Sequence, residues 1–150
     1  MKKVSIFLIL VLINLLPSMG STSNNENVNN IHEFDLPARA RLFLKSDFNH
    51  SKIVSITEKA NENKFVVVTA DGMRFEFDKE GVWTDVDCNT NQVPRFIIPT
   101  KLANSIMRYG GRNSKVVKIR RYGRNRFEVH LANETKMHFD KNYRMVTNNR

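Results

Sequence analysis

The stretch Phe75-Glu76-Phe77-Asp78-Lys79 returns 62 positions later as Met137-His138-Phe139-Asp140-Lys141. Each stretch begins 39 residues after a short apolar pair with proline, Leu36-Pro37 in one case and Ile98-Pro99 in the other. A unit of about 60 residues that occurs twice predicts two copies of one fold. The chain is therefore expected to hold a single domain, residues 35–150, made of a first repeat at 35–92 and a second at 93–150.

Each repeat is expected to begin with a helix and to continue with three or four strands. Asp35 is the expected N-cap of the first helix, and Gly110-Gly111 is expected to end the second. Apolar residues at helical spacing predict the buried sides: Ala40, Phe43 and Leu44 in the first helix, and Leu102, Ile106 and Tyr109 in the second. The expected strands are 53–58, 65–69, 73–78 and 82–87, followed by 116–121, 127–131, 135–140 and 143–146.

The strands of the second repeat alternate between apolar and polar residues. Phe127, Val129 and Leu131 alternate with Glu128 and His130, which is the two-residue period of a strand with one buried face. One face of the sheet is therefore expected to be apolar and covered by helices, and the other to be polar and open. The predicted fold class is α+β, with one continuous antiparallel sheet of about seven or eight strands and the helices on one face.

The hairpin that joins the last two alternating strands must keep the apolar residues on one face. A three-residue loop, Ala132-Asn133-Glu134, does so, whereas a two-residue turn would place apolar side chains opposite charged ones. The register predicted on the polar face sets Glu128 opposite His138, and His130 opposite Lys136. The equivalent loop of the first repeat, Ala70-Asp71-Gly72, has glycine at the left-handed position. Glu134 is therefore expected to be strained.

Residues 1–20 predict an export signal. Lys2-Lys3 precedes an apolar run from Val4 to Leu16, and small residues follow at the positions that a signal peptidase reads. A helix of this run would reach only ~20 Å, less than the ~30 Å hydrocarbon core of a bilayer, so a membrane anchor is the weaker alternative. We expect a periplasmic or secreted protein whose mature chain has no transmembrane segment. Residues 21–34 are polar and Asn-rich, and they predict a flexible leader.

The chain shows no recognisable catalytic or metal-binding pattern. Cys88 is the single cysteine, so no disulfide can form within the chain, and it is expected to be a lone thiol in a loop without a catalytic base. Carboxylates between Glu76 and Asp87 alternate along a strand instead of surrounding one ion, so no calcium site is expected. His130 and His138 should lie diagonally, which does not favour zinc. We expect no enzyme and no cofactor.

Charge differs sharply between the two repeats. Residues 21–92 hold 8 basic and 12 acidic residues, a net charge of −4, whereas residues 93–150 hold 14 basic and 3 acidic residues, a net charge of +11. The candidate binding residues are those expected on or beside the open face of the second repeat: Lys118, Arg120, Arg121, His130, Lys136 and His138. They indicate an acidic protein surface or an envelope polyanion as partner, unless the face is merely solvated. Nucleic acid is not expected, because the protein is exported and has no RNA-binding signature.

Several motifs together resemble a known family. The Leu-Pro helix, the Phe-Glu-Phe-Asp hairpin, Gly81-Val82-Trp83, Val86-Asp87 and the Val93-Pro94 linker follow one another here. In this order they resemble the PepSY-like, β-lactamase-inhibitor-like exported proteins of Gram-negative gut bacteria. The resemblance covers residues 35–146.

The resemblance implies two tandem helix-and-sheet units that share one sheet, and a non-catalytic binding or inhibitory role. The second repeat departs from the pattern at Glu134, where glycine is expected, and at Asn142-Tyr143, which replaces Glu80-Gly81. We expect an exported, non-catalytic binding or inhibitor-like protein that uses the open polar face. Electrostatic association with anionic envelope lipid or polysaccharide is the alternative.

Overall fold

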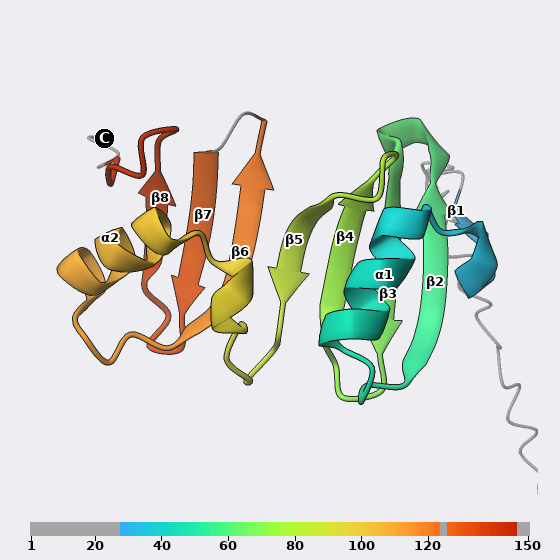
Figure 1. Ribbon diagram of the computed structural model, residues 1–150, viewed down its shortest axis with the longest axis horizontal. Helices are drawn as coiled ribbons and strands as arrows, with labels where there is room; N and C mark the ends of the chain where they lie inside the picture. Colours follow the sequence, from blue (N-terminus) through green and yellow to red (C-terminus); the bar gives the residue numbers. More distant parts are fainter. Residues whose placement is uncertain (1–27, 124–125, 147–150) are drawn as a thin grey trace, which may run out of the picture.

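The computed structural model describes residues 28–123 and 126–146, and the predicted export signal lies outside them. Within these residues the protein is an α+β fold with one eight-stranded antiparallel sheet and two α-helices (Figure 1). The strands follow one another in the sheet in chain order, from β1 to β8. The prediction of a continuous antiparallel sheet is therefore confirmed.

The helices lie on one side of the sheet. In Figure 1 both α-helices lie on the viewer's side, α1 over the half that contains β3 and β4 and α2 over the half that contains β6 to β8. The strands are β1 (Val28–Asn30), β2 (Ile53–Lys59), β3 (Lys64–Thr69), β4 (Arg74–Asp78), β5 (Trp83–Asp87), β6 (Val116–Tyr122), β7 (Arg126–Leu131) and β8 (Lys136–Phe139). The helices are α1 (Ala38–Asp47) and α2 (Thr100–Gly110), with 3-10 turns η1 (Glu33–Asp35), η2 (Ala60–Glu62) and η3 (Arg95–Ile97).

A row of buried apolar side chains crosses seven strands on the helix-bearing side. In register from β2 to β8 these are Ile56, Val67, Phe75, Val86, Ile119, Val129 and Met137. None of them is more than 7% exposed. Each such side chain contributes roughly 1.5–3 kcal/mol when fully buried, so this row and the helix residues packed on it form the main source of stability.

The two halves of the sheet meet at the pair β5–β6, which we call the seam. Three residue pairs join the strands there: Asp85 with Arg120, Val86 with Ile119, and Asp87 with Lys118. Beyond them, the backbone N–H of Cys88 donates to the carbonyl of Val117 at 2.9 Å. The seam is thus a short antiparallel junction whose centre, Val86 and Ile119, is fully buried.

The predicted β7–β8 hairpin is confirmed. Val129 pairs with Met137, and the polar pairs on the other face are Glu128 with His138 and His130 with Lys136. Glu134 has φ +66°, and Gly72 in the equivalent loop has φ +81°. The left-handed conformation expected at Glu134 is therefore present, and the strain that an L side chain incurs there stays a prediction.

Part of the predicted flexible leader is ordered. Val28–Asn30 forms β1, which pairs with β2 through Asn29 and Glu58, and η1 follows it. Backbone pairing with the edge of β2 does not need apolar side chains, so the polar composition did not reveal the strand. Asp35 lies in η1 and accepts a hydrogen bond from the His32 N–H at 3.0 Å. The helix begins later, with Pro37 as its N-cap, so the prediction of Asp35 as N-cap is wrong.

Tyr109 was expected in the core, and this prediction is wrong: its side chain is half exposed. The last turn of α2 approaches the sheet through Gly110, where an added Cβ would lie 2.8 Å from the Met137 Cε and 3.0 Å from a Leu131 methyl. This contact turns Tyr109 toward solvent. The expected last strand, 143–146, forms no full strand: Phe139 makes an isolated bridge with Met145, the Val146 N–H donates to the His138 carbonyl at 2.8 Å, and the Asp140 N–H donates to the Arg144 carbonyl at 2.9 Å.

Candidate binding face

The sheet side away from the helices carries a row of polar side chains. In register from β4 to β8 they are Glu76, Asp85, Arg120, Glu128 and His138. Neither α-helix lies on this side in Figure 1. We call this surface the open face, and it carries five of the six predicted site residues, all except Arg121.

Asp85 is the most deeply buried charge of the open face. Its side chain is 1% exposed, and its Oδ2 accepts from the Arg120 Nε at 2.6 Å and Nη2 at 2.5 Å. Its Oδ1 has no hydrogen-bond partner in the part of the chain that the structure describes. Burial raises the pKa of the Asp85 carboxyl above its ordinary value, although Arg120 and Lys118 act in the opposite direction. Asp85 of the first half is therefore a buried acid at the seam, and its ionisation there costs free energy.

Lys118 and Arg120 are ion-paired across the seam. Lys118 Nζ lies 2.9 Å from an Asp87 oxygen and 3.7 Å from Asp85, and its side chain is only 18% exposed. Their positive charge is thus matched by acids of the first half. Lys118 and Arg120 do lie on the open face, but they are not the free electropositive surface that we expected.

The first half of the open face carries a second set of ion pairs. Glu76 binds Arg74 at 2.5 Å and Lys64 at 3.2 Å, and Lys64 also pairs with Glu62. Burial raises the pKa of Glu76, but the ion pairs outweigh it and hold the pKa below its ordinary value. Glu76 of β4 is therefore already neutralised by basic side chains of its own sheet.

The second half of the open face carries what we call the histidine cluster: Tyr122, Glu128, His130 and His138. Glu128 lies 2.5 Å from the His130 Nε2 and 3.8 Å from the His138 Nδ1, and the Tyr122 hydroxyl donates to it at 2.7 Å. Partial burial raises the pKa of Glu128, but the hydrogen bonds from His130 and Tyr122 hold it below its ordinary value. His138 is 42% exposed and Lys136 is exposed, so this part of the face is accessible.

Two depressions are lined in part by residues of the open face. His130 and Lys136 line one of about 630 Å³, together with Asn89, Thr90 and Val117. Arg120 lines the other, of about 360 Å³, together with Lys64, Glu76, Asp85 and Tyr122. Four of the six predicted site residues therefore line two different depressions, His130 and Lys136 the first and Arg120 and Arg121 the second, and they do not line one cleft.

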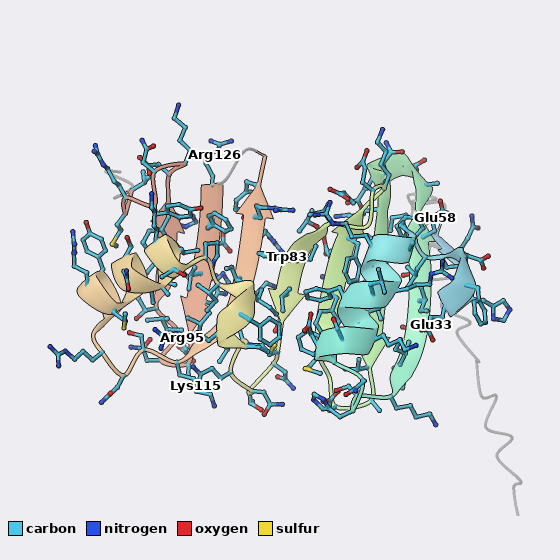
Figure 2. All side chains as sticks on the ribbon, viewed as in Figure 1. Glu33, Glu58, Trp83, Arg95, Lys115 and Arg126 are labelled. Carbon is cyan, nitrogen blue, oxygen red and sulfur yellow. The ribbon has the colours of Figure 1, made fainter. Side chains whose placement is uncertain are left out.

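Arg121 lines the same depression as Arg120 but differs from the other predicted site residues in the side of the sheet from which its side chain starts. It pairs in register with the buried Phe127, so its Cβ points to the helix-bearing side of the sheet. Its guanidinium stacks over the Trp83 ring at 5.0 Å and donates to the Trp83 carbonyl at 2.9 Å. Trp83 lies on β5 at the seam (Figure 2). Arg121 thus holds the two halves together where the backbone pairing of β5 and β6 ends.

The candidate residues drawn from the sequence did not include the three acids that hold the bases and histidines of the open face, Asp85, Asp87 and Glu128. A signal was available for the first two, because acids alternate along β5 and bases alternate along β6. Opposite charges in such a pattern favour two strands as neighbours. Cys88, just after β5, is buried, and burial together with Asp87 and Asp71 raises its thiol pKa to about 11. The thiol is therefore protonated and unreactive at neutral pH.

The described residues contain no group of three or more His, Cys, Asp or Glu side chains that could hold a metal ion. No helix within the same residues is long and apolar enough to span a membrane.

The chain is similar to solved structures that are described as putative periplasmic proteins. A solved structure from Bacteroides thetaiotaomicron, described as a putative calcium-regulated periplasmic protein, is 30% identical, with a TM-score of 0.73, and the match covers 81% of this chain and 95% of that one. A putative periplasmic protein from Bacteroides vulgatus is 26% identical, with a TM-score of 0.75 and coverage of 82% and 97%. A second protein from that organism, of unknown function, is 27% identical, with a TM-score of 0.71 and coverage of 80% and 95%.

None of the curated proteins compared with the chain matches it. A family model does match, over residues 63–147, and its description is putative β-lactamase-inhibitor-like, PepSY-like. This range takes in β3 to β8, both sides of the seam and the histidine cluster. The family resemblance drawn from the motifs is thereby confirmed, and the chain belongs to the PepSY-like, β-lactamase-inhibitor-like family.

Proposed function

We propose that this protein is a non-catalytic binding protein of the bacterial envelope whose open face receives a protein partner. One observation carries the proposal: helices cover one side of the eight-stranded sheet, while the other side holds a polar network in fixed geometry. The inhibitor-like description of the family and the periplasmic descriptions of three similar structures support it. We place the protein in the periplasm, or outside the cell, after removal of residues 1–20.

The histidine cluster and Lys136 are the part of the open face best suited to a partner. Glu128 fixes His130 and Tyr122 by hydrogen bonds, so these groups lose little conformational entropy on binding. The depression beside them has apolar side chains of Val117 and Leu131 in its lining as well as His130 and Lys136. A protein loop with an acidic or hydrogen-bonding side chain and a small apolar group matches this chemistry. Inhibition of a β-lactamase does not follow from fold likeness.

A photo-crosslinking amino acid at position 136 tests the proposal in the envelope of living cells. We expect a specific protein adduct from position 136 and none from position 52, an exposed position ahead of β2. His138→Ala should reduce the adduct at 136, because it removes an accessible group of the cluster. Equal adducts from both positions, or none from either, would argue against a partner at this face. Lys118 and Arg120 are unsuitable for this test, because changing them unpairs the buried Asp85.

The calcium regulation that the description of the Bacteroides thetaiotaomicron protein names is not part of our proposal for this chain. Here Glu76 is paired with Arg74 and Lys64, and Asp85 and Asp87 are paired with Arg120 and Lys118. Carboxylates already bound to basic side chains are poor ligands for a calcium ion, which needs six to eight oxygen atoms. Equal melting temperatures with calcium and with a chelator are the expected result.

We also infer that the two halves are tandem copies of one unit. Backbone hydrogen bonds that recur at an offset of 62 support this. The Gly81 N–H donates to the Asp78 carbonyl at 2.9 Å, and the Tyr143 N–H donates to the Asp140 carbonyl at 3.0 Å. Asp78 and Asp140 each accept two further backbone N–H groups, two and four residues later, through the side chain. Relatives that retain only one unit would test the inference directly.

A further inference from the structure

Much of the positive charge of the second half lies on the helix-bearing side. The segment from Arg95 to Arg112 comprises η3, α2 and the two residues after it, and it contains four basic residues and no acidic one. Arg95, Lys101, Arg108 and Arg112 are all exposed, and none has an ion-pair partner in the described chain. The bases of the open face are mostly neutralised, whereas these four are not.

Two exposed aromatic side chains accompany these bases. Phe96 on η3 is 64% exposed and Tyr109 on α2 is 50% exposed, although Leu102 and Ile106 on the opposite side of α2 are buried. Lys101 and Arg108 are seven residues apart, so they lie on the same outward side of the helix, two turns from each other. Figure 2 shows Arg95 on η3, which leads directly into α2. We call these six side chains the α2 surface: Arg95, Phe96, Lys101, Arg108, Tyr109 and Arg112.

The first half shows what is particular to this surface. Phe34 on η1, 62 positions before Phe96, is 84% exposed, and Leu42 on α1 is 67% exposed. However, Glu33 and Asp35 flank Phe34. Phe34 is therefore flanked by negative charge, whereas Phe96 follows Arg95 and has no acidic neighbour in its segment. Leu42 follows Arg41, so the difference in charge distinguishes η1 from η3 and does not extend to the two α-helices.

We propose that the α2 surface associates with the headgroups of anionic phospholipids. Basic side chains are attracted to the negative surface of such a membrane, and aromatic side chains favour the headgroup region, where an apolar ring and polar neighbours are both accommodated. A convex helix with single protruding rings fits a fluid headgroup layer, whereas a folded protein partner would need a matching pocket for each ring. Because the open face lies on the other side of the sheet, lipid contact leaves it free for the partner proposed above.

Vesicle co-sedimentation tests the proposal with protein isolated from the periplasmic fraction of a Gram-negative expression host. We expect binding to vesicles that contain phosphatidylglycerol and little binding to pure phosphatidylcholine. Each basic residue near an anionic surface strengthens binding about five-fold, so Lys101→Glu/Arg108→Glu should weaken it by at least about 25-fold. Lys52→Glu/Lys136→Glu makes the same change in net charge away from α2 and should have a much smaller effect.

The variant Phe96→Ala distinguishes binding to a lipid surface from binding to other polyanions. Removing this exposed ring should weaken binding to phosphatidylglycerol vesicles but leave binding to dextran sulfate, a soluble polyanion, unchanged. Melting temperatures of the variants should match the wild type, because every altered side chain is exposed. Equal binding to both vesicle types overturns the proposal, and so does equal weakening by the two charge-reversal pairs. If Phe96→Ala weakened binding to vesicles and binding to dextran sulfate alike, the assignment to lipid would be overturned.

Discussion

The first half of the sheet, β2 to β5, and the second half, β6 to β8, place the same tight turns at equivalent positions but occupy them with different residues. Gly72 and Gly81 have positive φ in the first half, and Glu134 and Tyr143 have positive φ at the matching positions of the second. The ring of Tyr143 stacks on Phe127 at 5.8 Å. Gly81 instead lies against the start of α1. The comparison teaches that a turn residue with positive φ can carry a side chain where no helix packs against the turn, and must be glycine where a helix does.

The largest expected effect is at Gly81. An added Cβ would lie 2.8 Å from the Ala40 backbone N and 2.8 Å from the Pro37 Cβ, in a residue with φ +76°. Gly81→Ala should therefore reduce the free energy of unfolding by about 3 kcal/mol, from backbone strain and the clash with α1 together. Urea denaturation measures this.

Gly72→Ala is the matched control for Gly81→Ala. It has the same positive φ, but its added Cβ would meet only the flexible Asn89 side chain, at 3.0 Å. Its expected cost is about 1 kcal/mol, from strain alone. Equal costs at the two positions would contradict the view that helix packing distinguishes them.

The next effect is at the seam, where the acidic half meets the basic half. Arg120→Met removes the partner that makes two contacts with the buried Asp85. A buried charge left without this partner costs about 2 kcal/mol, with Lys118 retained at 3.7 Å. Denaturant unfolding should show this loss. Lys136→Met, also on the open face but exposed, should be nearly neutral, and a similar loss there would weaken the role given to the seam.

Asp85 and Glu128, on opposite sides of Arg120, should show opposite pH dependence. The pKa of Asp85 is raised in the folded protein, so its ionisation costs stability, and this cost grows as the pH rises from its unfolded value of 3.8 through the folded pKa. The pKa of Glu128 is lowered, so its contribution is present above 4.5 and is lost as the pH falls through the folded pKa. As the pH rises, Asp85→Asn should gain stability relative to the wild type, and Glu128→Gln should lose it. Thermal melts of both variants from pH 3 to 7 measure this. A difference in melting temperature from the wild type that changes in the same direction with pH for both variants would contradict the assignment.

The smallest expected effect is in the β7–β8 loop, where Glu134 stands in place of the glycine of the first half. Glu134→Gly removes a side chain from a residue with φ +66° and restores the residue found in the first half. The melting temperature should rise, by the equivalent of up to ~1 kcal/mol. A lower melting temperature would mean that Glu134 makes a stabilising contribution that outweighs its strain.

The β7–β8 register could be predicted from sequence, but the charge pairing across the seam could not. Alternation from Phe127 to Leu131 and the parity of the hairpin determine which residues oppose one another, because both strands and their loop are contiguous in sequence. Lys118 and Arg120, by contrast, take their partners from β5, which is separated from β6 by η3 and α2. The alternating bases of β6 favour an acidic neighbour, but they identify neither β5 as that strand nor the register of the pair.

The same limit applies to the exposed residues of the helices. Helical spacing placed Tyr109 with Leu102 and Ile106, since periodicity describes the helix alone. The close contact of Gly110 with Met137 and Leu131 decides which way the last turn faces, and it depends on tertiary packing. The α2 surface was therefore not predicted, whereas the two buried positions of α2 were.

The row of apolar side chains through Val86 and Ile119 bears on how the protein unfolds. Both residues belong to one contiguous core that runs from β2 to β8. Separating the halves would expose this pair to water and leave two unpaired strand edges, which are templates for aggregation. Neither half can melt without uncovering the edge of the other, so heating should give one cooperative transition, with hydrogen exchange at β3 and β7 proceeding at closely similar rates.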